Sequence, residues 1–288
     1  MLAVYKRELK AYLHNVYGWL FMAALLMGMG ALVFVFNFMS NYPGIEYPLL
    51  YGQYALLLLV PILCMRSMAE DKRNKTDMFY LSLPMKTSAV VLGKYFAMLT
   101  IYALPCVLIC FYPLLLAGFG KVNFLTAYVS IIFFLLLGAA LIAVCQFLSS
   151  LTDNLVVAAV LGVLATAILL FSPMLAYWIP GTAIVSFFGY VVLALLLAGI
   201  AFLVTRNLSV TAIVGAVSVI PLSLVYVLAR ESFEGLLPDL LEFVSPFMHF
   251  ATFCEMGTFS IQSLILLLSY PVLFVFLTVR SADKLRWD

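Results

Sequence analysis

Charge is scarce in this chain of 288 residues. Asp, Glu, Lys and Arg together make up 10% of it, whereas hydrophobic residues make up 66%. A soluble domain carries about 25% charged residues. Because so few charges do not cover the surface of a water-soluble protein of this size, we expect lipid to be the main solvent of the chain.

Groups that bind metals are also few. The chain has two histidines, His14 and His249, and no His-Glu-x-x-His pair. His249, Cys254 and Glu255 form a rival candidate for the metal site of an intramembrane hydrolase, but only one histidine accompanies the other two residues. We therefore expect no metal site and no catalytic residue in this chain.

A nucleotide-binding loop is lacking as well. The sequence "GFGK" at 118–121 ends in Gly-Lys, but residue 115 is a leucine where the phosphate loop needs a glycine. The apolar runs also hold no ionisable residue deep within them, and a proton- or ion-coupled carrier needs one. We expect no cofactor in this chain, although a secondary carrier or channel stays open as an alternative.

Long apolar runs, by contrast, are abundant. A helix needs about 20 apolar residues to cross about 30 Å of hydrocarbon. Eight runs are candidates, at 16–39, 49–68, 88–118, 124–149, 154–178, 183–205, 209–229 and 260–280. Pro105 and Pro113 are expected to kink the third run. The sequence thus predicts an all-α, polytopic integral membrane protein with about eight transmembrane helices, forming a single domain over 1–288.

Lys and Arg are distributed unevenly between the loops. With the N-terminus in the cytoplasm, all 15 of them except Lys121 and Arg230 fall on the cytoplasmic side. Because cytoplasmic loops carry an excess of Lys and Arg, we expect both termini to be cytoplasmic. Residues 230–258 then lie outside, and their leucines recur at helical spacing among acidic residues, which predicts an external amphipathic segment.

The first fifteen residues have a helical apolar stripe, with basic residues on the opposite face. The stripe comprises Leu2, Tyr5, Leu9, Tyr12, Leu13 and Val16. A basic amphipathic helix of this kind lies in the cytoplasmic interface, with its lysines toward the lipid headgroups. Residues 1–15 are therefore predicted to form an interfacial elbow helix, the simpler alternative being a plain juxtamembrane anchor.

One cytoplasmic stretch combines charge with apolar side chains. In "AEDKRNKTDMFYLSLPMKTSAVVLGK", residues 69–94, the charges surround Met78, Phe79, Tyr80, Leu81 and Leu83. A solvated positive loop has no need of these side chains. They are expected either to dip into the membrane surface or to enter a groove on a soluble partner.

The same stretch resembles a known family. "MRSMAEDKRNKTDMFYLSLPMKTSAVVLGKYFA" is similar to the segment that follows the second span of ABC-2 type permeases, which share Met65, Arg66, Ala69, Glu70, Lys72, Thr76, Asp77, Leu81, Pro84, Val91, Leu92, Gly93, Lys94 and Tyr95. "VYKRELKAYL" resembles the elbow of that family, and "GAALIAVCQFLSSLTDNLVVAAVL" resembles its fourth and fifth spans. "SPFMHFATFCEMG" and "LFVFLTVRSADKLRW" resemble the gliding-motility-type subgroup.

The resemblance implies a function and a mode of action. It implies the permease subunit of an ATP-driven exporter in the bacterial cytoplasmic membrane, with ATP bound by separate cytoplasmic ATPase subunits. A second copy or a related permease would complete a dimer, membrane lipids would surround it, and no nucleic acid is expected as a partner. Residues 69–87 would form the coupling segment. The coupling residues are then Glu70, Asp71, Lys72, Thr76, Asp77, Phe79, Leu81 and Pro84.

The resemblance has one departure. Members of the family usually have six spans, whereas residues 180–230 supply two more here. An added pair keeps both termini on the same side of the membrane. The sequence therefore predicts a six-span core with two extra spans, whose role it does not indicate.

Overall fold

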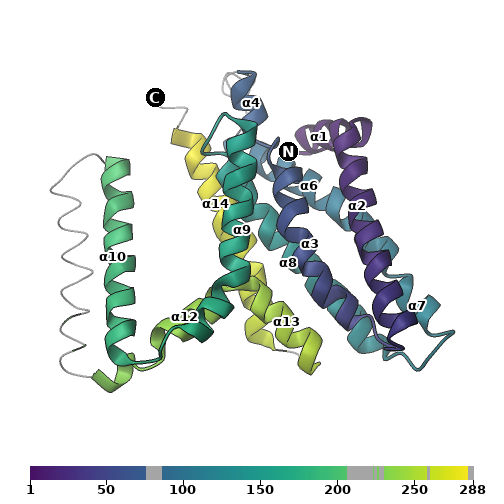
Figure 1. Cartoon of the computed structure of the whole chain (residues 1–288). Helices are drawn as coiled ribbons and strands as arrows, with labels where there is room; N and C mark the ends of the chain where they lie inside the picture. Colours follow the sequence, from purple (N-terminus) through teal and green to yellow (C-terminus); the bar gives the residue numbers. More distant parts are fainter. Residues whose placement is uncertain (76–85, 206–222, 224–225, 227–229, 258–259, 285–288) are drawn as a thin grey trace. The chain divides into compact units, whose positions relative to one another are not determined.

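A computed structural model describes all residues except 76–85, 206–222, 224–225, 227–229, 258–259 and 285–288 (Figure 1). The described residues form helices and turns and no β-strand. The helices are α1 (Leu2–His14), α2 (Val16–Val33), the π-helix η1 (Phe34–Met39), α3 (Glu46–Cys64), α4 (Ala69–Arg73), α6 (Thr87–Ile109), α7 (Tyr112–Leu116), α8 (Phe124–Ser149), α9 (Leu155–Trp178), α10 (Ala183–Thr205), the 3-10 helix η2 (Arg230–Phe233), α12 (Leu236–Val244), α13 (Pro246–Met256) and α14 (Ile261–Lys284).

Six helical stretches among the described residues are long and apolar enough to cross a membrane. They are Val16–Met39, Glu46–Arg73, Thr87–Leu116, Phe124–Ser149, Leu155–Trp178 and Ile261–Asp283. Each coincides with a predicted run, so the all-α polytopic fold is confirmed. The run predicted at 183–205 coincides with α10, and most of the run predicted at 209–229 lies outside the described residues.

The third predicted run is divided into two helices. Pro105 lies inside α6, which ends at Ile109, and α7 begins at Tyr112 with Pro113 in its first turn. A proline is well tolerated there because the first backbone N–H groups of a helix have no intrahelical acceptor. The helical stretch is therefore interrupted at Cys110 and Phe111, between the two prolines that were predicted to kink it.

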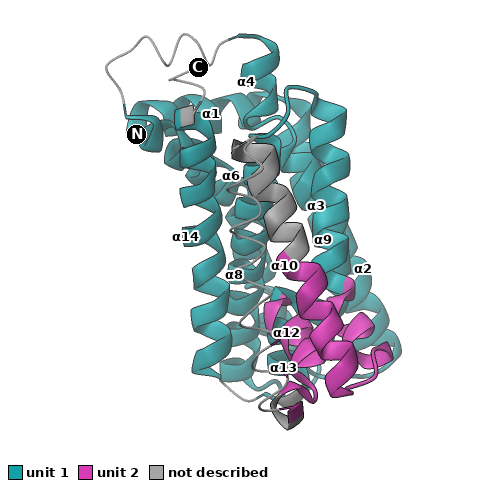
Figure 2. Cartoon of the chain, turned by 90° about the vertical axis from the view of Figure 1, so that its left-hand side faces the viewer, with its two compact units in different colours: residues 1–170, 246–288 teal, residues 171–245 magenta. Residues whose placement is uncertain are grey.

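Contacts divide the chain into two compact units. Unit 1 comprises 1–170 and 246–288, and unit 2 comprises 171–245 (Figure 2). The external segment predicted at 230–258 is thereby divided, since α12 belongs to unit 2 and α13 to unit 1. The assignment of 1–288 to a single domain stays a prediction.

Unit 1 is built around α8, which packs against α3, α6, α13 and α14. The small-residue stretch 138–143 of α8 is buried. Gly138 faces the ring of Tyr102 on α6 so closely that a Cβ atom at residue 138 would overlap the ring. The Tyr102 hydroxyl donates a 2.7 Å hydrogen bond to the carbonyl oxygen of Phe134. Glycine thus lets α6 and α8 approach closely, as small residues do between membrane helices.

Unit 2 contains α10, η2 and α12. The backbone N–H of Gly235 donates to the carbonyl oxygen of Gly181 at 3.0 Å, and Gly235 has a φ of 77°, which favours glycine. Leu237 on α12 is buried against Gly189 on α10. Residues 236–244 were predicted to be amphipathic. In the structure, one leucine of this helix packs on α10 within unit 2.

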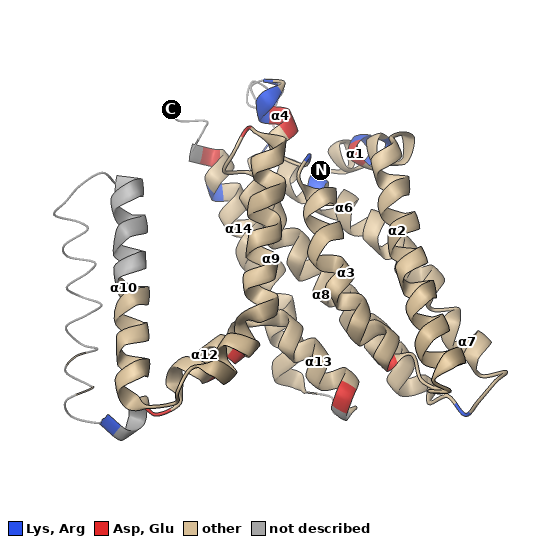
Figure 3. Ribbon diagram, viewed as in Figure 1, with Lys and Arg blue, Asp and Glu red and all other residues tan. Residues whose placement is uncertain are grey.

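Lys and Arg gather at one end of unit 1. Figure 3 shows them on α1, on α4 and near the end of α14, while the loop between α7 and α8, which contains Lys121, lies at the opposite end. Helix α1, helix α4 and the last turns of α14 therefore lie at the same end of unit 1 (Figure 3). Unit 1 is thus polarised along its spans.

Candidate functional site

The charged helix α4 carries three of the eight predicted coupling residues, Glu70, Asp71 and Lys72. Its acidic residues lie in the first turn and its basic residues in the last, as the helix dipole favours. The other five residues lie outside the described residues, namely Thr76, Asp77, Phe79, Leu81 and Pro84. The structure therefore places the beginning of the predicted coupling segment.

Glu70 holds an arginine at the end of α3. Arg66 donates from Nε to Glu70 Oε2 at 2.8 Å and from Nη2 to Glu70 Oε1 at 2.6 Å. The guanidinium carbon lies 4.5 Å from the centre of the Tyr17 ring on α2. A two-point hydrogen bond and a stacked ring fix both the position and the plane of this guanidinium.

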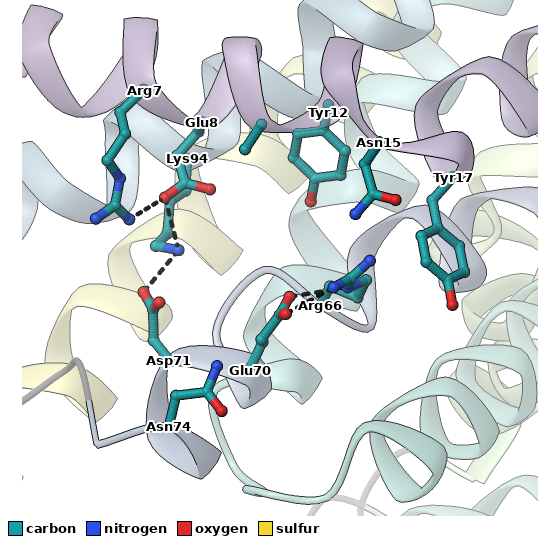
Figure 4. Close-up of a pocket in the computed structure, with 11 residues that line it drawn as sticks. Arg7, Glu8, Tyr12, Asn15, Tyr17, Arg66, Glu70, Asp71, Asn74 and Lys94 are labelled. Carbon is teal, nitrogen blue, oxygen red and sulfur yellow. Dashed lines mark hydrogen bonds and ion pairs between the residues drawn. The ribbon is translucent and has the colours of Figure 1, made fainter.

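Asp71 holds a lysine that is almost fully buried. Lys94 on α6 has 3% of its side chain exposed, and its Nζ lies 2.7 Å from Asp71 Oδ2 and 3.3 Å from Glu8 Oε1 (Figure 4). The same nitrogen donates to the carbonyl oxygen of Ser67 at 2.6 Å. An ammonium has three protons and finds three acceptors here, which is what a buried charge requires.

These contacts join three helices that are distant in sequence. Glu8 comes from α1, Asp71 from α4 and Lys94 from α6, and Glu8 also pairs with Arg7 at 2.5 Å. We call Glu8, Asp71 and Lys94 the ion cluster. Because its charges are largely desolvated, separating any one of the three helices from the others would leave a buried charge without its partner.

Helix α4 is also fixed to the end of α8. The hydroxyl of Ser149 accepts hydrogen bonds from the backbone N–H groups of Met68 and Ala69, at 3.2 and 3.1 Å. Lys72 Nζ donates to the carbonyl oxygen of Ser150. These bonds satisfy N–H groups at the start of α4, which have no acceptor within that helix.

We expect Ser149→Ala to lower the free energy of unfolding by about 1–3 kcal/mol, because it leaves buried backbone N–H groups unpaired. Ser269→Ala on α14 is the matched control. Ser269 is exposed and its hydroxyl donates to the carbonyl oxygen of Leu266 in the preceding turn, so a change within ±0.5 kcal/mol is expected. Thermal unfolding in detergent measures both variants, and equal stabilities would show that the Ser149 contacts contribute nothing to holding α4.

The predicted elbow helix is present as α1, but it packs on protein as well. Val4 is buried against Gly93 on α6, and Tyr12 donates to the carbonyl oxygen of Leu63 on α3 at 3.3 Å. Burial raises the pKa of Tyr12 well above its usual value. Leu2 and Val16, which belong to the apolar stripe, are exposed on the surface of the protein. The helix thus turns part of its surface toward α3 and α6, and its place in the membrane interface stays a prediction.

Sequence reasoning missed the ion cluster. Lys94 counted as a cytoplasmic lysine and as a residue shared with the ABC-2 type permeases, but no partner was predicted for it, and Glu8 was not singled out. One signal was available, because "VVLGKYFAM" places a lysine inside an apolar run, where a charge requires a partner. The partners of this lysine were not predictable from the sequence, because residues 8, 67 and 71 come close to it only in the folded chain.

The rival metal set does not come together among the described residues, where no three His, Cys, Asp or Glu side chains are grouped as ligands would be. His249 Nδ1 lies 3.1 Å from the hydroxyl of Ser263. Burial raises the pKa of the Cys254 thiol to about 12.

The six apolar stretches place the chain in the class of multi-pass membrane proteins. At the charged end, buried ion pairs join α1, α4 and α6. The model of the family described as ABC-2 family transporter protein matches residues 33–184. That match covers just over half of the chain, which therefore belongs to the ABC-2 transporter family. No curated protein and no solved structure matches the chain.

The family match confirms the family predicted from the sequence and makes the chain a membrane transport component. It does not distinguish the gliding-motility-type subgroup, which stays a prediction. The matched range contains α4, Lys94 and the predicted coupling segment 69–87, whereas α1 with Glu8 lies before it.

Proposed function

We propose that this chain is the permease subunit of an ATP-driven exporter and that it couples to a separate cytoplasmic ATPase through residues 69–87. One observation carries the proposal. Helix α4, which begins this segment, is bonded to α1 and α6 through the ion cluster and to α8 through Ser149 and Ser150. A displacement of the segment would therefore be passed to several spans at once.

The distribution of charge supports the proposed orientation. The basic residues of α1, α4 and α14 lie at one end of unit 1, and the excess of Lys and Arg in cytoplasmic loops assigns that end to the cytoplasm (Figure 3). An ATPase in the cytoplasm would meet α4 and residues 76–87 there. We place the protein in a bacterial cytoplasmic membrane on the strength of the family resemblance.

The proposed assembly needs partners because the chain lacks a phosphate-binding loop of its own. Two ATPase subunits would bind ATP, and a second copy of this chain or a related permease would complete the transport path. Coupling in this scheme depends on a soluble surface that accepts the apolar side chains between 78 and 83. Phe79 is the largest apolar side chain among them and is the one to change.

We expect Phe79→Asp to weaken binding of the ATPase at least about tenfold, because a carboxylate replaces a ring in an apolar contact. Insertion into the membrane should be unchanged. The measurement is co-purification of the ATPase that accompanies the wild-type chain in native membranes, together with its ATP turnover. Phe119→Asp is the matched control, since Phe119 is 77% exposed and lies in the loop beyond α7, at the opposite end of unit 1.

Three outcomes would contradict the proposal. The first is a Phe79→Asp variant that binds its ATPase and stimulates ATP turnover normally, which would remove residues 69–87 from the coupling role. The second is a wild-type chain that recovers no ATPase from native membranes. Transport of a solute by the purified chain alone in liposomes would establish a secondary carrier instead.

A further inference from the structure

Two cavities of opposite character meet beside Arg66. The first has a volume of about 380 Å³ and lies between α1 and α4, where charged and amide side chains line it (Figure 4). The second has a volume of about 240 Å³ and lies between α2 and α3, where Leu20, Ala24 and Leu59 are among its lining residues. Both are lined by Tyr12, Tyr17 and Arg66, so they form one site with a polar and an apolar part.

The site matches one kind of molecule in its surroundings. Its polar part lies at the charged end of unit 1, and its apolar part lies along α2 and α3, two helices that are long and apolar enough to cross a membrane. A molecule with a charged headgroup and an acyl chain fills both parts at once. We propose that this site binds a membrane glycerophospholipid, with its phosphate at Arg66 and part of one acyl chain between α2 and α3.

Arg66 presents a free edge to such a phosphate. Glu70 occupies Nε and Nη2, and the ring of Tyr17 covers a face of the guanidinium, so that Nη1 has no hydrogen bond to any described residue. Arginine suits a phosphate because its N–H groups are fixed in a plane. The side-chain amides of Asn15 and Asn74, which line the same cavity, provide further donors.

The charges around the polar part are balanced. Arg7, Arg66 and Lys94 line it together with Glu8, Glu70 and Asp71. Because the three cations and three anions offset one another, a large effect of the net charge of the headgroup is not expected. The phosphate itself should matter most, since it is the group that Arg66 contacts.

The inference depends on the membrane embedding of the chain and not on the proposed ATPase. The site lies within unit 1, and its lining residues come from α1 to α4 and the start of α6. Loss of ATPase coupling would therefore leave the lipid site intact. Absence of lipid binding would likewise say nothing about the proposed ATPase coupling, which the Phe79→Asp variant tests separately.

Binding is tested on the purified full chain in detergent, with three lipids that share the same two acyl chains. These are phosphatidylethanolamine, phosphatidylglycerol and diacylglycerol, and native mass spectrometry measures how much of each is bound. Both phospholipids should bind with similar affinity. Diacylglycerol should bind at least about tenfold more weakly, because it lacks the phosphate. Equal binding of all three lipids would overturn the proposal.

Two pairs of variants locate the site. Ala24→Phe fills the apolar part and should reduce phospholipid binding at least about fivefold, because less of the acyl chain is buried. Ala23→Phe, one residue earlier and exposed, should bind as the wild type does. Arg66→Gln should bind about tenfold more weakly. Its control is Arg280→Gln, since Arg280 also lies over a ring, that of Phe276, but is outside both cavities.

The variants also separate binding from folding. Arg66→Gln breaks the pair with Glu70 and can lower stability, whereas Ala24→Phe leaves every ion pair in place. The thermal midpoint should rise on adding phosphatidylethanolamine to the wild type and to both controls, because a ligand of the folded state stabilises it. A similar rise in Ala24→Phe, or unchanged phospholipid binding in both Ala24→Phe and Arg66→Gln, would overturn the proposal.

Discussion

Lys94→Met is expected to lower the free energy of unfolding by about 3–5 kcal/mol, because it removes the cation from a buried cluster and leaves carboxylates behind. Asp71 and Glu8 both lie against the Lys94 ammonium, and their side chains are 18% and 13% exposed. Methionine has nearly the length of lysine and fills the same space without a charge. The loss is measured by thermal or denaturant unfolding of the detergent-purified chain.

Two further variants show whether the charge is the cause. Lys121→Met makes the same change at an exposed position at the other end of unit 1, and we expect a shift within ±0.5 kcal/mol. Lys94→Met combined with Asp71→Leu removes both charges of the Lys94–Asp71 pair and should regain much of the lost stability, since apolar replacements of buried ion pairs are often neutral. A single variant as stable as the wild type would refute the structural role of the ion cluster.

The same variant bears on the mechanism. The ion cluster links α4 by charge to the elbow helix α1 and to the span α6. If residues 69–87 receive the movement of an ATPase, a folded Lys94→Met chain should still bind that ATPase through the unchanged segment. Transport per ATP hydrolysed should fall, because α4 would move with less of the membrane domain attached to it.

Gly138→Ala is expected to destabilise the chain by about 1–3 kcal/mol through overpacking. A Cβ atom at residue 138 would overlap the ring of Tyr102, which is fully buried and packed at its edge against Phe21. Moving the ring would also break its 2.7 Å hydrogen bond to the carbonyl oxygen of Phe134. An unpaired buried hydroxyl costs a further ~1–3 kcal/mol, so the whole effect is large for a single added methyl group.

Gly28→Ala is the matched control for that prediction. A Cβ atom at residue 28 of α2 meets nothing within 4 Å, so the added methyl group occupies open space. Alanine is favoured over glycine inside a helix by about 0.5–1 kcal/mol, and this variant should be as stable as the wild type or slightly more so. Similar melting temperatures for the two variants would show that the α6–α8 contact at Gly138 is loose.

Much of the fold was predictable because each span is a property of one continuous run of residues. The run predicted at 124–149 is α8, and the run predicted at 183–205 is α10. Length and hydropathy decide whether such a run crosses a membrane, and both are readable locally. The break between α6 and α7 was less readable, since Pro113 signals either a kink or a new first turn.

The candidate site was predictable only in part. The unusual composition of 69–94 drew attention to α4, and Glu70, Asp71 and Lys72 proved to make the ion pairs and hydrogen bonds that anchor it. Ser149 was not predicted, because a serine at a helix end has many possible acceptors and donors nearby. Its role as the cap of α4 depends on α8 ending beside residues 68 and 69.

The sequence alone determined the solvent of this protein and located the six runs that form membrane-crossing helices among the described residues, because burying apolar area in lipid depends on composition along each run. The asymmetry of Lys and Arg likewise fixed which end of the spans is basic. Only the tertiary structure decided which charges meet. Glu8, Asp71 and Lys94 lie far apart in the chain, and a buried ammonium is stable only where the fold brings acceptors to it, here from α1, from α4 and from Ser67 in the turn before α4.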